Sequence, residues 1–247
     1  MICRPNRMDT EMICPKCKFE QDDSNGTCAR CGVIFEKYYA CRQSLLEREE
    51  PRESLAQKAK DILFAAPEHG GKAVLAARAA IFLLTLALGW RFIFSPLDTA
   101  ANSLMHFVNL PFHEAGHIVF MPFGRVMHSL GGSIGQLLMP LICCGALLLK
   151  TRDPFGASIA LWWHGENYID LAPYIDDARS LSLPLLGGNT GETAPYGFHD
   201  WQFILTELGL LKYDHLFAHL AYGFGVFVML TAYAWGGYLL LAQYRRL

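Results

Sequence analysis

Charged residues are scarce in this chain. Lysine, arginine, aspartate and glutamate make up 18% of its 247 residues, against about 25% in typical soluble domains, and hydrophobic residues make up 52%. Positive and negative charges nearly cancel, leaving a formal net charge of −2 at pH 7. A chain with so little basic excess offers no surface for nucleic acid, and its positive mean hydropathy predicts a membrane protein.

Two marks of a secreted protein are also missing. The eight cysteines do not predict a disulfide scaffold, because four have the spacing of metal ligands and Cys143 and Cys144 lie in an apolar run. No signal peptide is expected ahead of the first module, because the segment from Met1 to Glu53 is polar and charged. These absences favour an N-terminal end that stays in a reducing compartment.

Two CxxC pairs, Cys14/Cys17 and Cys28/Cys31, are separated by ten residues. Each pair can place two thiolates on one tight turn, so the two turns predict a closed tetrahedral site for structural zinc. A module this small needs the metal in order to fold. Redox-active pairs are the alternative, but a redox pair would not need a second copy so near. The stretch "CARCGVIFEKYY" resembles the short zinc ribbons that open many bacterial proteins, which implies a cytoplasmic ribbon over residues 1–40.

Residues 41–72 form a charged segment between the ribbon and the apolar remainder. Leucines and isoleucines at helical spacing predict short amphipathic helices, broken at Pro51 and Pro67. We expect a linker that lies near the membrane surface. A partner-binding role for the segment is the alternative.

The remainder, residues 73–247, predicts an all-α polytopic membrane domain. Five apolar stretches are long enough to span a bilayer, and they cover 73–94, 104–123, 134–149, 155–175 and 216–242. Basic residues cluster before the first stretch, which favours a cytoplasmic N-terminus. The basic residues of the later loops do not fit five strict crossings, so a further element within 198–212 is left open. The expected fold therefore has about five or six transmembrane helices and a small N-terminal zinc ribbon.

The stretch "HEAGH", from His113 to His117, has the HExxH pattern of zinc hydrolases. Residues four apart share one face of a helix, so both imidazoles can reach one metal ion. Glu114 is placed to take a proton from a water molecule at the metal and to pass it to the leaving amine. Two imidazoles and a carboxylate are costly in an apolar segment unless paired or metal-bound, which favours a catalytic zinc site over a polar network.

A catalytic zinc site needs a third protein ligand. The segment "WWHGENYIDLAPYIDDARS" supplies the candidates His164, Glu166, Asp170, Asp176 and Asp177. Glu166 and Asp170 are four residues apart and can share a helix face. Asp176 follows Pro173, where a helix is expected to break. The alternative is that the last two acidic residues and Arg179 form a solvated helix end.

The region from Ala73 to about Ser180 resembles the site-two protease family of intramembrane zinc metalloproteases. "HEAGHIVFMPFG" is similar to the family's HExGH helix, in which two histidines bind zinc and the glutamate is the general base. The order of features also matches, with one span, the HExxH span, a glycine-rich span with an amide, and a span with a carboxylate. The resemblance implies zinc on His113 and His117, with Glu114 as base.

Two further segments carry the resemblance. "GGSIGQLLMPL" is similar to the family segment whose asparagine steadies the scissile carbonyl, which implies that role for Gln136. "APYIDDAR" is similar to the family's Pro-Pro-Leu-Asp-Gly-Gly-Arg, whose aspartate is the third zinc ligand, which implies Asp176. Asp177 stands where the family has glycine, and a shift of one residue makes Asp177 the ligand. Asp170 also stays open.

The segment from Leu183 to His215 has no counterpart in that comparison. Its first half predicts a loop, and "FHDWQFILTELGLL" predicts an amphipathic helix capped near Asp200. We expect Asp200 to be an N-cap and His199 a loop residue, and a visit of either side chain to the active site is the alternative. A lid or substrate gate is a hypothesis that follows from position alone.

These observations predict an integral membrane zinc metallopeptidase, placed in the bacterial inner membrane with its N-terminus in the cytoplasm. It is expected to hold one catalytic and one structural zinc ion and to cleave a peptide bond in or near a membrane segment of another protein. The ribbon is a possible docking site for a protein partner. Two alternatives stay open: a catalytically silent membrane scaffold that binds zinc and a partner, and a membrane hydrolase of a non-peptide substrate such as a lipid amide.

Overall fold

The structure, a computed structural model, describes residues 11–22, 25–49, 54–64, 71–95 and 103–247. The chain divides into two compact units, residues 1–55 and 56–247. The first ten residues of the predicted ribbon, and both prolines at which the linker helices were expected to break, lie outside the described residues.

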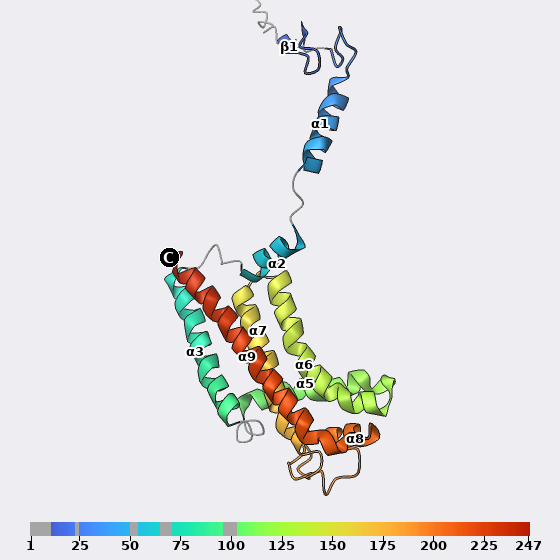
Figure 1. Cartoon of the computed structure of the whole chain (residues 1–247), viewed down its shortest axis with the longest axis vertical. Helices are drawn as coiled ribbons and strands as arrows, with labels where there is room; N and C mark the ends of the chain where they lie inside the picture. The colour runs from blue at the N-terminus through green and yellow to red at the C-terminus, as the bar shows by residue number, and fades with distance from the viewer. Residues whose placement is uncertain (1–10, 23–24, 50–53, 65–70, 96–102) are drawn as a thin grey trace, which may run out of the picture. The chain divides into compact units, whose positions relative to one another are not determined.

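The N-terminal unit consists of two short strands and a helix (Figure 1): β1 (Glu11–Ile13), β2 (Glu20–Asp22) and α1 (Phe35–Glu49). The strands pair antiparallel. The Cys14–Cys17 turn follows β1, and the Cys28–Cys31 turn comes after β2. The buried ring of Phe35, the first residue of α1, packs against Cys14 and Cys28. Because this cluster is the small apolar interior of the described ribbon, a metal at the cysteines would supply much of its stability.

The C-terminal unit is helical. Its elements are α2 (Leu55–Phe64), which begins at the boundary, α3 (Lys72–Phe94), α5 (Leu104–Phe120), the 3₁₀ turn η1 (Met121–Phe123), α6 (Arg125–Leu149), α7 (Pro154–Asp176), α8 (Asp200–Glu207), the 3₁₀ turn η2 (Leu211–Tyr213) and α9 (Asp214–Tyr244). Helices α1 and α2 are the helices expected in the charged segment, although α1 starts six residues earlier, inside the predicted ribbon.

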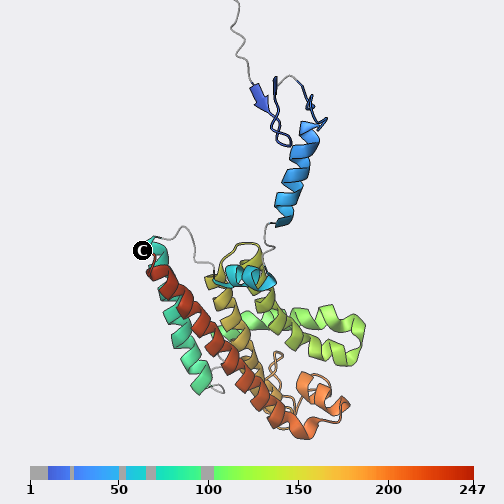
Figure 2. The same cartoon turned by 45° about the horizontal axis from the view of Figure 1, so that its top comes forward.

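Helix α9 makes the most extensive helix–helix contact of this unit, with α7. It lies along α7 and beside α3, as both views show (Figures 1 and 2). Small residues allow the close approach of α7 and α9, since a Cβ atom on Gly165 would lie 2.8 Å from the carbonyl oxygen of Gly225. A buried apolar cluster fills the space between the three helices, and it comprises Phe92, Trp162, Ile169, Met229 and Ala232.

Helix α6 joins α5 to α7. Its first part lies against α5 and its second part rises beside α7, so that α6 bends along its length (Figures 1 and 2). Pro140 lies inside α6 and cannot donate a backbone hydrogen bond to Gln136, which accounts for a bend in this region. Glycines bring α5 and α6 together, because a Cβ atom on Gly116 would lie 2.0 Å from the carbonyl oxygen of Gly131.

Three helical segments of the described chain are long and apolar enough to cross a membrane: Lys72–Phe94, Arg125–Leu149 and Leu211–Tyr244. The prediction of five or six spans is therefore corrected. The predicted span 104–123 is a helix of 17 residues, about 26 Å long, which is short of the roughly 30 Å hydrocarbon core. The predicted span 155–175 is long enough, but α7 carries too many polar residues to qualify.

Candidate metal centres

The four cysteines of the ribbon converge on one point. Their sulfur atoms all lie within 4.8 Å of one another. Sγ of Cys14 is 3.8 Å from Sγ of Cys31, and Sγ of Cys17 is 3.6 Å from Sγ of Cys28. Zinc–sulfur bonds of about 2.3 Å in a tetrahedron put the sulfurs about 3.8 Å apart. The spacing fits four thiolates around one metal ion and is too long for disulfides.

Both cysteine turns have the same backbone geometry. In each, the amide four residues after the first cysteine donates to the carbonyl oxygen of that cysteine at 2.9 Å, from Lys18 in one turn and Gly32 in the other. Both donors have a positive φ, +60° for Lys18 and +69° for Gly32. Lys18 therefore adopts, at some conformational cost, the left-handed conformation that Gly32 adopts freely.

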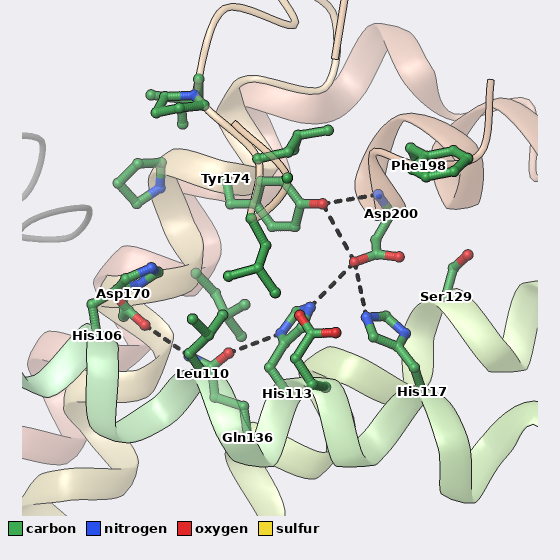
Figure 3. A pocket seen from close by; sticks show the side chains of 18 of the residues that line it. His106, Leu110, His113, His117, Ser129, Gln136, Asp170, Tyr174, Phe198 and Asp200 are labelled. Carbon is green, nitrogen blue, oxygen red and sulfur yellow. Dashed lines mark hydrogen bonds and ion pairs between the residues drawn. The ribbon is translucent and has the colours of Figure 1, made fainter. Parts of the chain in front are cut away.

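A second convergence of possible metal ligands lies in the C-terminal unit (Figure 3), and it joins His113, His117 and Asp200. Oδ2 of Asp200 is 3.2 Å from Nε2 of His113 and 3.4 Å from Nε2 of His117. Ligands about 2.0–2.1 Å from a tetrahedral zinc ion lie roughly 3.3–3.4 Å apart. Both distances from Asp200 thus fit a shared metal ion, and all three ligand atoms lie within 4.8 Å of one another.

The far nitrogen of each histidine is held by an oxygen acceptor. Nδ1 of His113 lies 3.1 Å from Oε1 of Gln136, and Nδ1 of His117 lies 2.8 Å from the backbone carbonyl of His128. An oxygen acceptor keeps a proton on Nδ1, so that Nε2 of each ring faces Asp200. There each Nε2 can donate a second proton to the carboxylate or, as a neutral imidazole, offer its lone pair to a metal ion.

Gly132 leaves the space that a metal ion would occupy. A Cβ atom at this position of α6 would lie 2.5 Å from Nε2 of His113 and 2.6 Å from Nε2 of His117. Any larger residue would therefore press on both rings. The predicted pair of histidines on one helix face is confirmed, and the facing helix leaves their coordinating atoms free.

Asp200 is the third residue of this group, which matches the alternative that the sequence left open and not the expected N-cap. The N-cap of α8 is His199, whose Nδ1 accepts from the amide of Gln202. The Tyr174 hydroxyl accepts from the Asp200 amide at 3.0 Å and donates to Oδ2 of Asp200 at 3.3 Å. Burial raises the pKa of the Asp200 carboxyl, but the imidazoles of His113 and His117 outweigh it, so this pKa is lowered and Asp200 stays ionised.

The residues that the family resemblance placed on the metal lie elsewhere. Asp176 forms a partly exposed ion pair with Nδ1 of His215. Asp177 accepts hydrogen bonds from Ser180, Ser182 and Leu183 at the start of the following loop. Neither belongs to the group of His113 and His117. The physical reason is that the end of α7, which carries these aspartates, anchors the following loop. That loop then brings Asp200 to the two histidines.

The remaining acidic residues of α7 form a buried network behind the site. Asn109 donates to Glu166 at 3.0 Å and to Asp170 at 3.1 Å, and Gln136 donates to Asp170 at 2.9 Å. His164 takes no part, since its Nδ1 contacts the backbone carbonyl of Leu137. The Gln136 amide is thus engaged at both ends, by His113 and by Asp170. The resemblance had implied that Gln136 contacts a substrate carbonyl. In the structure its side chain instead holds His113 in place.

A cavity of about 820 Å³ opens onto the His113–His117–Asp200 group. One face of α5 lines it over three turns, with His106, Leu110, His113, Glu114, His117 and Ile118. Opposite them lie apolar side chains of the loop after α7, which include Leu183, Pro184, Leu185, Leu186 and Phe198. Glu114, an exposed residue, therefore lines the cavity that contains the group of His113, His117 and Asp200.

The signal that could have found Asp200 was present in the sequence. An aspartate within an otherwise apolar helix start, next to a histidine, is the composition of a ligand segment as much as of a cap. Only the fold distinguishes the two, because 87 residues separate Asp200 from His113. Comparisons of the chain with protein-family models, with curated proteins and with solved structures found no match.

Proposed function

We propose that this chain is a membrane zinc hydrolase that cleaves a peptide bond in or near a membrane segment of another protein. The observation that carries the proposal is the convergence of His113, His117 and Asp200 on one point, in the cavity that also exposes Glu114. Two imidazoles and a carboxylate are a donor set of catalytic zinc sites, which keep a coordination position open.

The chemistry follows from these groups. Zinc held by His113, His117 and Asp200 would polarise a water molecule and the scissile carbonyl. Glu114 accepts a proton from the water as its oxygen bonds to the carbonyl carbon. Glu114 then donates this proton to the amide nitrogen as the C–N bond breaks.

The chain's polar groups keep the ligands oriented during this reaction. Gln136 and the carbonyl of His128 hold the two imidazoles, and Tyr174 holds Asp200. Such supporting bonds raise ligand basicity and fix the ligand geometry. Glu114 and an accessible cavity favour an enzyme over the silent scaffold, because a scaffold needs neither. The ribbon is left as a structural zinc site on the cytoplasmic side, where a protein partner can dock.

Turnover of membrane peptides tests the proposal. Purified protein, reconstituted in lipid with zinc, is mixed with fluorogenic peptides of apolar sequence, and cleavage is followed by fluorescence and mass spectrometry. We expect Glu114→Gln to lower kcat by about 10²- to 10⁴-fold while zinc content stays unchanged. Asp176→Asn, at a carboxylate outside the metal-ligand group, serves as the control and is expected to retain activity.

Three results would speak against the peptidase. Equal rates for wild type and Glu114→Gln would remove the proposed base. Cleavage of a lipid amide, with no peptide cleaved by zinc-loaded protein, would keep the hydrolase and transfer it to a non-peptide substrate. The absence of any Glu114-dependent hydrolysis would support the scaffold.

A further inference from the structure

The cavity is elongated along α5. Its lining residues on this helix recur at intervals of three and four from His106 to Ile118, which is one face of the helix. Twelve residues of α-helix rise about 18 Å, and an extended peptide rises about 3.3 Å per residue. The groove therefore has room for roughly five residues of an extended chain.

His106 stands at the end of this groove away from His117 (Figure 3), with His113 between them. Seven residues separate His106 from His113, which corresponds to about 10 Å along the helix. Leu110 on α5 and Leu171 on α7 also line the cavity and offer apolar contacts to a bound chain. His106 is thus the polar side chain that a bound peptide would meet about three residues from the metal.

Asp170 fixes the orientation of the His106 ring. Oδ1 of Asp170 lies 3.0 Å from Nδ1 of His106, and the Asp170 side chain is 3% exposed. Asn109 and Gln136 donate to the other oxygen of Asp170. These hydrogen bonds from side-chain amides stabilise the carboxylate, and the carboxylate in turn favours the charged form of His106. Within the described chain no hydrogen bond engages Nε2 of His106, and this side chain is one-third exposed.

We propose that His106 is a substrate-binding subsite that donates a hydrogen bond from Nε2 to a carbonyl or carboxylate oxygen about three residues from the scissile bond. The inference rests on the proposed function and deepens it, because it defines the substrate as an extended apolar peptide with one hydrogen-bond acceptor at a set distance. Gln136 links Asp170 to His113, so the subsite and the metal-ligand group share one hydrogen-bonded chain.

A positional scan of peptides tests this subsite. A fluorogenic peptide of leucine and alanine carries one glutamine, moved one position at a time, and a matched peptide carries methionine at the same position. Glutamine and methionine are similar in length, but only glutamine has a carbonyl oxygen. We expect the ratio of kcat/KM for glutamine over methionine to reach about tenfold at the position three residues from the cleaved bond. At other positions the ratio is expected to stay near one.

His106→Ala is expected to abolish this peak, whereas Val108→Ala is expected to keep it. Val108 lies on the same helix, is 40% exposed and does not line the cavity. A flat ratio in wild type, or a peak that persists in His106→Ala, would overturn the subsite.

Binding measurements separate this inference from the peptidase itself. The dissociation constants of the same peptides are measured on zinc-loaded Glu114→Gln, with and without His106→Ala. In one outcome, wild type cleaves no peptide while glutamine at one position strengthens binding through His106. That result would support the subsite and contradict the peptidase. If peptides are cleaved but neither rate nor binding depends on glutamine position, the peptidase stands and the subsite falls. The absence of both cleavage and positional binding overturns both.

Discussion

Oδ2 of Asp200 lies 3.2 Å from Nε2 of His113, although 87 residues separate these residues along the chain. The two histidines come together within a single helix, whereas Asp200 reaches them only after the chain has passed through α6, α7 and the following loop. The three-residue group is therefore complete only in the folded helical unit. The cysteine group, in contrast, closes within eighteen residues of sequence and can form locally.

The first prediction concerns the number of metal ions. Protein purified in detergent and supplied with zinc is expected to hold two zinc ions per chain, as measured by elemental analysis. Asp200→Ala should lower this number to one, because two imidazoles alone bind zinc weakly. A variant with all four ribbon cysteines changed to serine should also retain one. Asp176→Asn is the control and should retain two. A second zinc ion that persists in Asp200→Ala would contradict the ligand assignment.

The second prediction follows from the glycine beneath the histidines. Gly132→Ala places a methyl group 2.5–2.6 Å from both Nε2 atoms. Such overpacking costs about 1–3 kcal/mol, so we expect zinc to bind this site roughly ten- to a hundredfold more weakly, with the ribbon unaffected. Competition with a fluorescent chelator measures the affinity.

Gly145→Ala provides the matched control for that experiment. It makes the same change in the same helix, at a position with open space within 4 Å of the new atom. An unchanged zinc affinity in Gly132→Ala would contradict the prediction, because it would show that the two imidazole rings can accommodate the added methyl group.

Local parts of the structure could be predicted from the sequence. The spacing of Cys14, Cys17, Cys28 and Cys31 identified the ribbon site, because each pair closes its own turn. The spacing of His113 and His117 identified the shared helix face for the same reason. These features depend on residues within a few positions of one another, so the geometry of one turn or one helix was enough.

The third ligand could not be predicted in the same way. Choosing Asp200 over Asp176 or Asp177 requires the path of the loop after α7, and the sequence gives no geometry for that path. The resemblance to site-two proteases favoured Asp176 by its motif alone. In the fold Tyr174, two residues earlier, touches Asp200 instead, so the end of α7 supports the ligand without supplying it.

The predicted number of membrane spans is not supported, for a related reason. Hydropathy scores each helix alone, whereas the polar residues of α7 are stabilised by a neighbour. Glu166 and Asp170 receive hydrogen bonds from Asn109 on α5, and Trp163 donates to the same asparagine at 2.8 Å. Buried side-chain hydrogen bonds therefore join α5 to α7, and the sequence of neither helix shows that it needs the other.

The third prediction concerns the support of His113 by Gln136. Gln136→Leu removes the oxygen that accepts from Nδ1 of His113 and leaves the three ligands in place. Loss of such a supporting bond typically weakens metal affinity by about 10- to 100-fold. Ser133→Ala is the control, because the buried Ser133 hydroxyl has no hydrogen-bond partner within the described chain. Equal zinc affinities of wild type and Gln136→Leu would show that the ring is held by other contacts.

The last prediction concerns acid stability and Asp177. Burial raises the pKa of this carboxyl, but hydrogen bonds from the Ser180 hydroxyl, the amides of Leu183 and Ser182 and the Ser182 hydroxyl outweigh it and lower the pKa below its usual value. A carboxyl whose pKa is lower in the folded state stabilises the fold above its unfolded pKa of about 3.9. This stabilisation is lost as the pH falls through the lower, folded pKa.

Thermal unfolding of wild type and Asp177→Asn checks the sign of this effect. At pH 7 we expect Asp177→Asn to be less stable by about 1–3 kcal/mol, because the amide group turns an N–H towards donors that need an acceptor. The difference should stay constant down to about pH 4 and then shrink as wild type is protonated. Chelator-treated protein is used so that loss of metal in acid does not contribute. A gap in Tm that stays the same from pH 7 to pH 3 would mean that the loop is held by its backbone and packing, and that the Asp177 charge contributes nothing.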